Sequence, residues 1–462
     1  MILAIDQGTT GTTCLVIDGE LAVRGRGYAE LPQHFPQPGW VEHDPEEIWA
    51  SVLAAAEAAV ADAHIRPGEL RALGITNQRE TTVLWERSTG RPVANAIVWQ
   101  DRRTAERCRE LPADRLRELT GLVADPYFSA TKLEWLLARH DGDLAFGTVD
   151  SWLVWKLTDG HIHVIDETNA SRTLLVSLAS LAWDEELLEL FGVPPGVLPE
   201  IVPSSGVVAE AKLLGATVPI AGIAGDQQAA LVAAGGAAKA TYGTGAFVLA
   251  PAELAPPPRG LVLTAAARSA REERRYALEG SVFVTGAAVQ WLRDGLGLLT
   301  DAAQSEAMAE SVDGTGGVYF VPALAGLGSP HWAPDARGVL TGLTRGTTRE
   351  HLVRAALEAT AYQTRDVLET MPFSLDRLRA DGGQTQNRFA MQFLADVLGI
   401  PVEVAAEREQ TALGAALLAG LATGVYDVPR ATPAGATYEP RLERDEAERL
   451  YAGWREALRR TL

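Results

Sequence analysis

The sequence predicts a two-lobed α/β protein with its functional site in the cleft between the lobes. Two observations carry this prediction. The chain has 462 residues, which is more than one hydrophobic core usually organises. It also repeats one pattern in outline, because a strand followed by a turn of glycine and threonine opens each half, at Ile2–Thr10 and at Ala240–Gly245. Sites of α/β proteins lie at domain interfaces and at the ends of strands.

Composition narrows the class of protein. The chain is 47% hydrophobic and 22% charged, which is typical of a globular protein and not of a disordered one. Its net charge of −19 argues against nucleic acids and anionic membranes as partners. The first residues, Met1–Asp6, lack the basic region of a secretory signal. Cys14 and Cys108 are too few for a disulfide scaffold, so we expect a reducing, cytoplasmic location without integral membrane association.

The first elements are predicted from alternation and capping residues. Ile2–Ile5, Thr13–Ile17 and Leu21–Gly27 read as three antiparallel strands joined by polar turns. A helix is expected to follow, with Asp44 as its N-cap and Pro45 in its first turn. Glu47 would complete a capping box with Asp44.

The remaining elements alternate between strands and helices, as the predicted fold class requires. In the first half we expect strands at Ala72–Thr76, Thr81–Glu86, Pro92–Gln100 and Pro219–Ala224, helical stretches near 102–119 and 131–139, and further regular structure at Thr148–Trp155 and Ile162–Ile165. In the second half we expect helices around 283–293, 301–311, 350–370, 387–398 and 410–422.

One turn has the composition of a phosphate-binding loop. The P-loop is excluded because none of the four lysines follows a glycine, and no Gly-x-Gly is completed to a dinucleotide fingerprint. Asp6–Thr10 joins two apolar strands with a glycine and two threonines, so its amides and hydroxyls can bind an anion. Asp6 could hold magnesium through water. An ordinary polar hairpin turn remains the alternative.

Two further strand ends carry polar and aromatic side chains that could bind a small polyol. Gly74–Thr82 ends in Arg79 and Glu80, and a guanidinium beside a carboxylate can donate to one hydroxyl and accept from another. Trp99 closes the next strand and could form an apolar wall. The alternatives are a surface ion pair of little energetic value and an ordinary core tryptophan.

Asp226 is the candidate catalytic base. It lies between the apolar run that ends at Ala224 and the start of a helix, where open α/β sheets place their ligands. A carboxylate in that position can take the proton of a hydroxyl that attacks a phosphoryl group. A helix N-cap without a catalytic role is the alternative.

Together these segments resemble the FGGY carbohydrate kinases, and within that family the glycerol kinases. The similarity runs from Ile5 to about Trp454. The motifs that carry it are Ile5–Thr10, Pro38–Pro45, Gly74–Thr82, Asn95–Arg103, Asp125–Ser129, Gly147–Asp150, Thr168–Arg172, Gly222–Ala230, Thr241–Phe247, Gln290–Asp294, Gly338–Leu343 and Tyr362–Asp366.

The resemblance implies an actin-like, ribonuclease-H-like fold in each lobe. Residues 1–233 would bind glycerol and carry the first phosphate turn and the base, and residues 234–462 would bind the nucleotide. The implied reaction is the phosphorylation of glycerol by ATP and Mg²⁺ to sn-glycerol 3-phosphate, that is, an ATP:glycerol 3-phosphotransferase. Members of the family commonly form homo-oligomers, which we expect here.

The resemblance also implies a role for individual residues. Asp226 would be the general base, and Asp6 would hold the metal ion together with Asp226. Glycerol would be bound by Arg79, Glu80, Trp99, Tyr127, Asp226, Gln227 and Phe247. The nucleotide would be bound by Thr9, Thr10, Gly11, Thr244, Gly286, Gln290, Gly414 and Leu418.

Two departures from the family pattern bear on the reaction and its control. Thr13 stands where relatives carry an arginine near the phosphates. The stretch Glu210–Pro219 has one glycine and no arginine, whereas relatives inhibited by fructose 1,6-bisphosphate have a glycine-rich loop followed by arginine. We therefore expect no inhibition by that anion.

Two other functions stay open at this stage. A kinase of another small polyol or ketose would differ from a glycerol kinase by modest changes in the pocket. An actin-like module that binds a nucleotide without transferring a phosphoryl group would not need a carboxylate at position 226. The presence of Asp226, and of the pair Arg79 and Glu80, favours a glycerol kinase.

Overall fold

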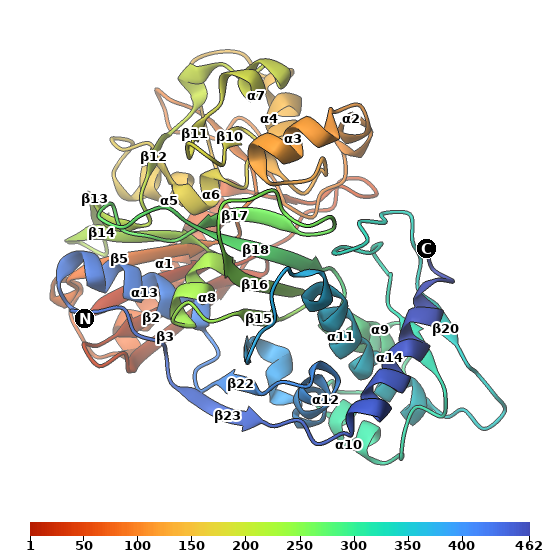
Figure 1. The fold of residues 1–462 in the computed structure, drawn as a ribbon. Coiled ribbons are helices and arrows are strands. Elements are labelled where there is room, and N and C mark those ends of the chain that lie inside the picture. The colour runs from red at the N-terminus through yellow and green to blue at the C-terminus, as the bar shows by residue number, and fades with distance from the viewer.

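The computed structural model describes residues 1–462 and consists of two lobes, each built on one large mixed β-sheet (Figure 1). The sheet of the first lobe has the strand order β13-β14-β5-β1-β2-β3. Its strands are β1 (Ile2–Gln7), β2 (Gly11–Ile17), β3 (Val23–Glu30), β5 (Ala72–Asn77), β13 (Ser205–Leu213) and β14 (Ala216–Gly225). Strands β5 and β14 run parallel to β1, and the other pairs are antiparallel.

The sheet of the second lobe repeats this arrangement, in the order β17-β18-β16-β15-β21-β22-β23. Strands β21 and β22 continue parallel to β15, and β23 closes the sheet in the antiparallel sense. The strands are β15 (Lys239–Tyr242), β16 (Ala246–Ala252), β17 (Val262–Ala266), β18 (Arg275–Val282), β21 (Leu378–Asp381), β22 (Val402–Ala405) and β23 (Ala434–Tyr438). The two halves therefore share a topology, as the repeated strand and turn predicted.

The first sheet is covered on both faces by helices. Leu3 and Ile5 of β1 belong to the apolar cluster that includes α1 (Pro45–Asp62) and α5 (Val149–Leu157). Ile2 and Ala4, which point to the other face, pack with α13 (Gln410–Thr423). This alternation follows from the two-residue period of a strand.

Helices α8 and α13 connect the two lobes. Helix α8 (Asp226–Ala233) follows the last strand of the first sheet and also contacts β15 and β16 of the second. Helix α13 follows the strands of the second lobe, yet it packs on β1, β5 and β14 of the first and against α8. In Figure 1 it is the blue helix beside the red and orange strands at the left.

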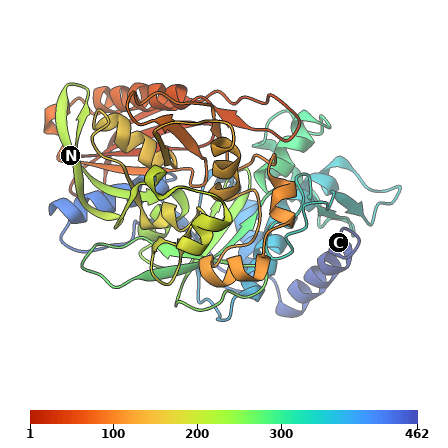
Figure 2. The ribbon, with the colours of Figure 1, turned by 90° about the horizontal axis from the view of Figure 1, so that it is seen from above.

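The other helices cover the second sheet or belong to an insertion. In the second lobe they are α9 (Gly286–Asp294), α10 (Gln304–Glu310), α11 (Arg349–Thr370), α12 (Arg388–Leu398) and α14 (Arg444–Leu458). Between β5 and β13 they are α2 (Ala105–Arg109), α3 (Ala113–Thr120), α4 (Ser129–Leu137), α6 (Glu167–Ala170) and α7 (Glu185–Leu190). Figure 2 shows the N-terminus and α14 at opposite ends of the molecule.

Five two-stranded sheets of short strands lie outside the two large sheets. Their strands are β4 (Glu42–His43), β6 (Val83–Glu86), β7 (Ala96–Ile97), β8 (Leu144–Gly147), β9 (Val164–Asp166), β10 (Val176–Ser177), β11 (Ala182–Trp183), β12 (Glu200–Val202), β19 (Tyr319–Val321) and β20 (Val339–Thr341). No helix is both long and apolar enough to cross a membrane.

Three local predictions need correction. The strand expected at Pro92–Gln100 is reduced to β7, because the chain turns at Asp101, whose carboxylate accepts hydrogen bonds from the amides of Val41 and Arg103. The helical stretch near 102–119 is split into α2 and α3. Asp44 caps α1 at the amide of Glu46, whereas Glu47 contacts His34 and forms no capping box.

Candidate active site

The ends of the parallel strands bring the predicted residues of the first lobe to one edge. In the sheet register, Gln7 at the end of β1 pairs with Asn77 of β5, and Asn77 pairs with Gly225 of β14. Asp6 lies one residue before the first of these positions, and Asp226 follows the last. Parallel strands place their carboxyl ends at the same edge, so residues far apart in sequence meet there.

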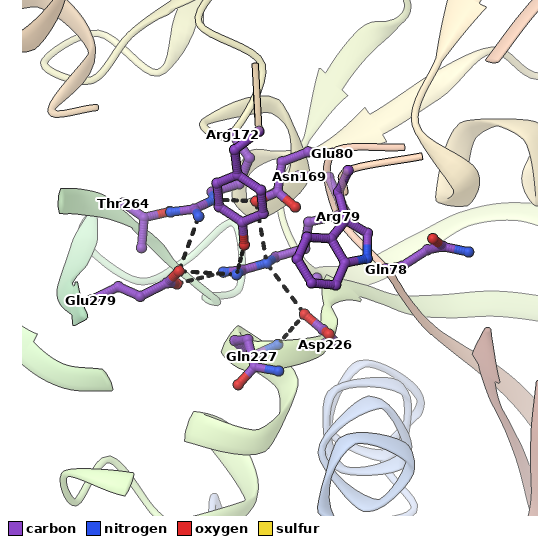
Figure 3. A network of polar contacts seen from close by, with 12 residues as sticks. Gln78, Arg79, Glu80, Asn169, Arg172, Asp226, Gln227, Thr264 and Glu279 are labelled. Carbon is purple, nitrogen blue, oxygen red and sulfur yellow. Dashed lines mark hydrogen bonds and ion pairs between the residues drawn. The ribbon is translucent and has the colours of Figure 1, made fainter. Parts of the chain in front are cut away.

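Asp226 is anchored through one of its two carboxylate oxygens. Its Oδ1 lies 3.2 Å from Arg79 Nε and accepts a hydrogen bond of 2.7 Å from the amide of Gln227. No protein hydrogen bond involves Oδ2, and 29% of the side chain is exposed to solvent. Figure 3 shows the bonded oxygen facing Arg79 and the other oxygen free. This geometry leaves one oriented oxygen available to accept a proton.

Arg79 is buried, and both of its terminal nitrogens donate hydrogen bonds while its Nε forms the ion pair with Asp226. It donates to Tyr127 Oη at 3.0 Å, to both oxygens of Glu279 at 2.5 and 3.0 Å, and to Gln228 Oε1 at 3.4 Å. A guanidinium has five N–H donors, and four hydrogen bonds already engage the two terminal nitrogens. To bind a substrate hydroxyl, as predicted, Arg79 would have to share or replace one of these hydrogen bonds. Its ion pair with Asp226 is already formed.

A second arginine completes a buried ionic network around Arg79 (Figure 3). Arg172 Nε lies 2.7 Å from Glu80 Oε1, and Arg172 Nη2 lies 3.0 Å from Glu279 Oε1. The side chains of both arginines and both glutamates are at most 2% exposed. Although burial alone would raise it, the two guanidinium groups lower the pKa of Glu279 to about 2.

Sequence reasoning missed the roles of Arg172 and Glu279. Arg172 lies in the motif Thr168–Arg172, which carried the family resemblance without a stated role, and Glu279 lies within β18 of the other lobe. Glu279 is separated from Arg79 by 200 positions in the sequence. No local pattern links residues at that distance, so only a known contact between the two lobes could have paired them.

Three aromatic side chains lie together beside this network. The rings of Trp99 and Tyr127 have centroids 5.5 Å apart, and those of Trp99 and Phe247 are 6.2 Å apart. Trp99 Nε1 donates a 2.9 Å hydrogen bond to Thr9 Oγ1. The aromatic wall predicted from Trp99 and Phe247 is thus assembled, and it is linked directly to the first phosphate turn.

Asp6 has the environment of a carboxylate suited to a cation. Burial and the nearby carboxylates Glu409 and Asp226 raise its pKa to about 7, although the hydroxyl of Thr411 donates to it. A bound divalent cation would favour the ionised carboxylate and oppose this shift. No group of three or more His, Cys, Asp or Glu side chains could hold a metal ion. Asp6 would thus offer a single carboxylate to a cation whose other ligands are water or phosphate, which is how Mg²⁺ is commonly bound.

Three of the predicted nucleotide residues of the second lobe, Thr244, Gly286 and Gln290, lie on the turn after β15 and on helix α9 next to it. Thr244 is exposed in the turn between β15 and β16, and its carbonyl accepts the amides of Thr285 and Ala287 at the start of α9. Gly286 packs on this turn so closely that a Cβ there would lie 2.4 Å from the carbonyl oxygen of Gly243. Gln290 is exposed one helical turn later.

Gly11, Gly414 and Leu418 lie elsewhere. Gly11 is buried against β3, where a Cβ would meet the hydroxyl of Tyr28 at 2.5 Å. A Cβ at Gly414 would lie 1.8 Å from the carbonyl oxygen of Ala229, so this glycine permits the contact between α13 and α8. Leu418 is 3% exposed in a small apolar cluster. All three residues also have a packing role, and their contact with a nucleotide stays a prediction that the structure does not test.

A turn that the sequence analysis did not assign lies beside Gly286 instead. Gly382 follows β21 with a positive φ of 91°, in contact with the backbone of Tyr242. Gln384 lies two residues after Gly382, and its Cδ is 3.8 Å from the point that a Cβ at Gly286 would occupy. Its amide nitrogen and oxygen are both buried and have no hydrogen-bond partner. A buried unpaired amide is costly in a folded protein, so Gln384 is a candidate ligand contact. The pair Gly382-Gly383 after an apolar strand was the signal available in the sequence.

Comparison with known proteins agrees with this geometry. Residues 1–233 match the N-terminal domain of the FGGY family of carbohydrate kinases, and residues 238–423 match its C-terminal domain. A glycerol kinase of Trichlorobacter lovleyi is 52% identical, and glycerol kinase 2 of Thermotoga maritima is 49% identical; each alignment covers 100% of this chain and 98% of the relative. The crystal structure of Plasmodium falciparum glycerol kinase with ADP has a TM-score of 0.91 at 34% identity, over 100% of this chain and 98% of that one.

Proposed function

The chain belongs to the FGGY family of carbohydrate kinases, and we propose that it transfers the γ-phosphoryl group of ATP to glycerol. The observation that carries the proposal is the anchored carboxylate of Asp226, whose Oδ2 makes no protein hydrogen bond and whose partner Arg79 contacts Tyr127 and Phe247 of the aromatic wall. The full-length similarity to glycerol kinases supports glycerol as the acceptor and ATP as the donor.

The reaction follows from the groups at the strand edge. A terminal hydroxyl of glycerol gives its proton to Asp226 Oδ2 as its oxygen attacks the γ-phosphorus. The bond between that phosphorus and the oxygen bridging to the β-phosphate breaks, so that ADP leaves and glycerol 3-phosphate forms. Arg79 holds the base in place, and Trp99, Tyr127 and Phe247 provide apolar contact for the carbon chain. Glu80, Gln227 and Tyr127 supply further polar atoms for the hydroxyls.

The nucleotide would lie between the first phosphate turn and the surface of the second lobe. Thr9 and Thr10 offer hydroxyls and amides to the transferred phosphate. Thr244, Gly286 and Gln290, with the added Gln384, offer the second surface. Gly11, Gly414 and Leu418 stay proposed as further nucleotide contacts, through backbone or apolar atoms. Mg²⁺ would be held by Asp6 and the phosphate oxygens, with Asp226 nearby, and would supply positive charge to the transferring phosphoryl group. Because Thr13 stands where relatives carry an arginine near the phosphates, the transferring phosphoryl group would depend more on the charge of Mg²⁺ than it does in those relatives.

A coupled assay of ADP release tests the proposal directly. The purified chain would be given MgATP with glycerol, with other polyols, with pentuloses, and with no acceptor. We expect turnover that depends on glycerol. Preferred turnover of a pentulose would support the alternative of a ketose kinase, and turnover that is independent of any acceptor would refute phosphoryl transfer to a polyol.

We also propose a cytoplasmic, homo-oligomeric enzyme that needs no nucleic acid or membrane partner. Both cysteines are free and buried, which suits a reducing compartment. The homo-oligomer is proposed from the habit of the family alone. Sedimentation of the purified chain would measure it.

A further inference from the structure

Lys239 is one of four lysines in the chain, and its ammonium group is buried between the lobes. It lies on β15 of the second lobe and is 0% exposed. Its Nζ donates to Gln227 Oε1 on α8 and, at 2.8 Å, to Thr241 Oγ1. No carboxylate lies within ion-pair distance of it. A buried ammonium without a direct counter-ion costs free energy, which suggests a functional reason for its presence.

The contact with Lys239 determines which way the amide of Gln227 faces. An ammonium group only donates, so the atom of Gln227 that meets it must be the oxygen. The amide nitrogen of Gln227 then points the other way, and Figure 3 shows it on the side of Asp226. This Nε2 has no hydrogen-bond partner in the protein but is not sealed from solvent, since it is absent from the buried atoms that lack partners.

We propose that Lys239 is a positioning residue that fixes Gln227 as a hydrogen-bond donor to the acceptor substrate. This role rests on the proposed function and extends it, because it explains how the site recognises a hydroxyl group of the substrate. A hydroxyl can accept a hydrogen bond from Gln227 Nε2 and donate its own proton to a carboxylate such as Asp226. With the amide reversed, the same position would present an oxygen that repels the lone pairs of that hydroxyl.

The burial and the charges around Lys239 make its hydrogen bond to Gln227 depend on pH. Burial lowers its pKa to about 8, while Asp381 on β21, Asp226 on α8 and Glu279 on β18 oppose that shift; Arg79 adds to it. Above its pKa the lysine loses the charge that strengthens its hydrogen bond to Gln227. The KM for glycerol is therefore expected to rise as the pH passes about 8, and the KM for ATP is expected to change less.

A double-mutant cycle tests whether Lys239 acts through Gln227. Lys239→Met and Gln227→Ala should each raise the KM for glycerol, by about tenfold for one lost hydrogen bond to a substrate hydroxyl. The KM for ATP should change less than about twofold. Because both changes remove the same contact, the double variant should resemble Gln227→Ala alone. Lys212→Met is the matched control, since Lys212 forms an exposed ion pair with Asp159 and should leave all constants unchanged.

If Lys239→Met fails to fold, the variant Gln227→Glu provides a second test of the same hydrogen bond. The glutamate would pair with Lys239 and preserve its burial, but it would have no donor for the substrate. We expect unchanged thermal stability together with a raised KM for glycerol. Additive effects of the two single substitutions, or a normal KM in Gln227→Glu, would overturn the role of Lys239. Absence of glycerol-dependent turnover in the unmodified chain would instead refute the proposed function.

Discussion

Glu279 offers the sharpest test of the buried ionic network, because it joins two arginines of the first lobe from a strand of the second. The change Glu279→Gln keeps the shape of the side chain and removes its charge. It leaves Arg79 and Arg172 with Glu80 as their only fully buried carboxylate partner. Loss of one partner in a buried ion pair costs about 3–5 kcal/mol, because an uncompensated charge remains.

The pKa of Glu279 gives a second route to the same magnitude. The pKa falls from 4.5 to about 2 on folding, and each unit corresponds to about 1.4 kcal/mol, so the charge contributes about 3 kcal/mol. Because the folded-state pKa is lowered, this stability is fully present above pH 4.5 and is lost only as the pH falls toward 2. The deficit of the variant should therefore be equal at pH 6 and at pH 8.

Thermal unfolding measures this deficit. For a lobe of roughly 200 residues, about 3 kcal/mol lowers the Tm by about 6–12 °C. Glu403→Gln serves as the control, since Glu403 lies in the same lobe and pairs with the exposed Arg377 at 2.7 Å; it should shift the Tm by only about 1–3 °C. If both variants unfold at the same temperature, the network contributes no more than a surface ion pair and the reasoning is refuted.

Three further predictions concern the reaction and its control. Asp226→Asn should lower kcat by about 10²–10⁴-fold, with a smaller effect on the KM for ATP in steady-state assays, because the base is lost while the nucleotide surface remains; a near-normal kcat would contradict the assignment. Gln384→Ala should raise the KM for ATP and leave that for glycerol unchanged, whereas Gln304→Ala on the exposed part of α10 should change neither. Fructose 1,6-bisphosphate, titrated in initial-rate assays with excess Mg²⁺, should not inhibit, because the hairpin between β13 and β14 offers only Lys212, which is already paired with Asp159; saturable inhibition not competitive with ATP would show the opposite.

Local patterns predicted the strand ends at which the site forms. Asp6 lies near the end of an apolar strand and Arg79 and Asp226 lie just after such strands, and alternation, turn composition and the family motifs located them correctly at one sheet edge. The repeated strand and turn predicted the second lobe for the same reason. These features depend on neighbours within a few residues, which a sequence displays directly.

The partners of the buried charges could not be predicted in this way. Glu279 meets Arg79 across 200 positions, and Lys239 meets Gln227 from the opposite lobe. Such pairs depend on how two sheets are placed relative to each other, and the sequence of each strand is compatible with many partners. Arg79 was expected to bind substrate, and that role stays a prediction; its buried contacts with Glu279, Tyr127 and Asp226 could not be read from the sequence.

The position of Asp226 depends on helix α13, which comes from the other half of the chain. Gly74, Gly222 and Gly414 let backbone meet backbone there, since a Cβ at these positions would lie 2.3, 2.6 and 1.8 Å from Ala415, Ala419 and Ala229 respectively.

Ala229 is in α8, the helix that begins at Asp226, so α13 fixes the base through contacts in which no flexible side chain intervenes. A glycine inside a helix indicates that something approaches closely, but the sequence does not reveal whether a ligand or another backbone does so. At Gly414 the backbone of Ala229 approaches, so α13 and the helix that begins at Asp226 meet without an intervening side chain.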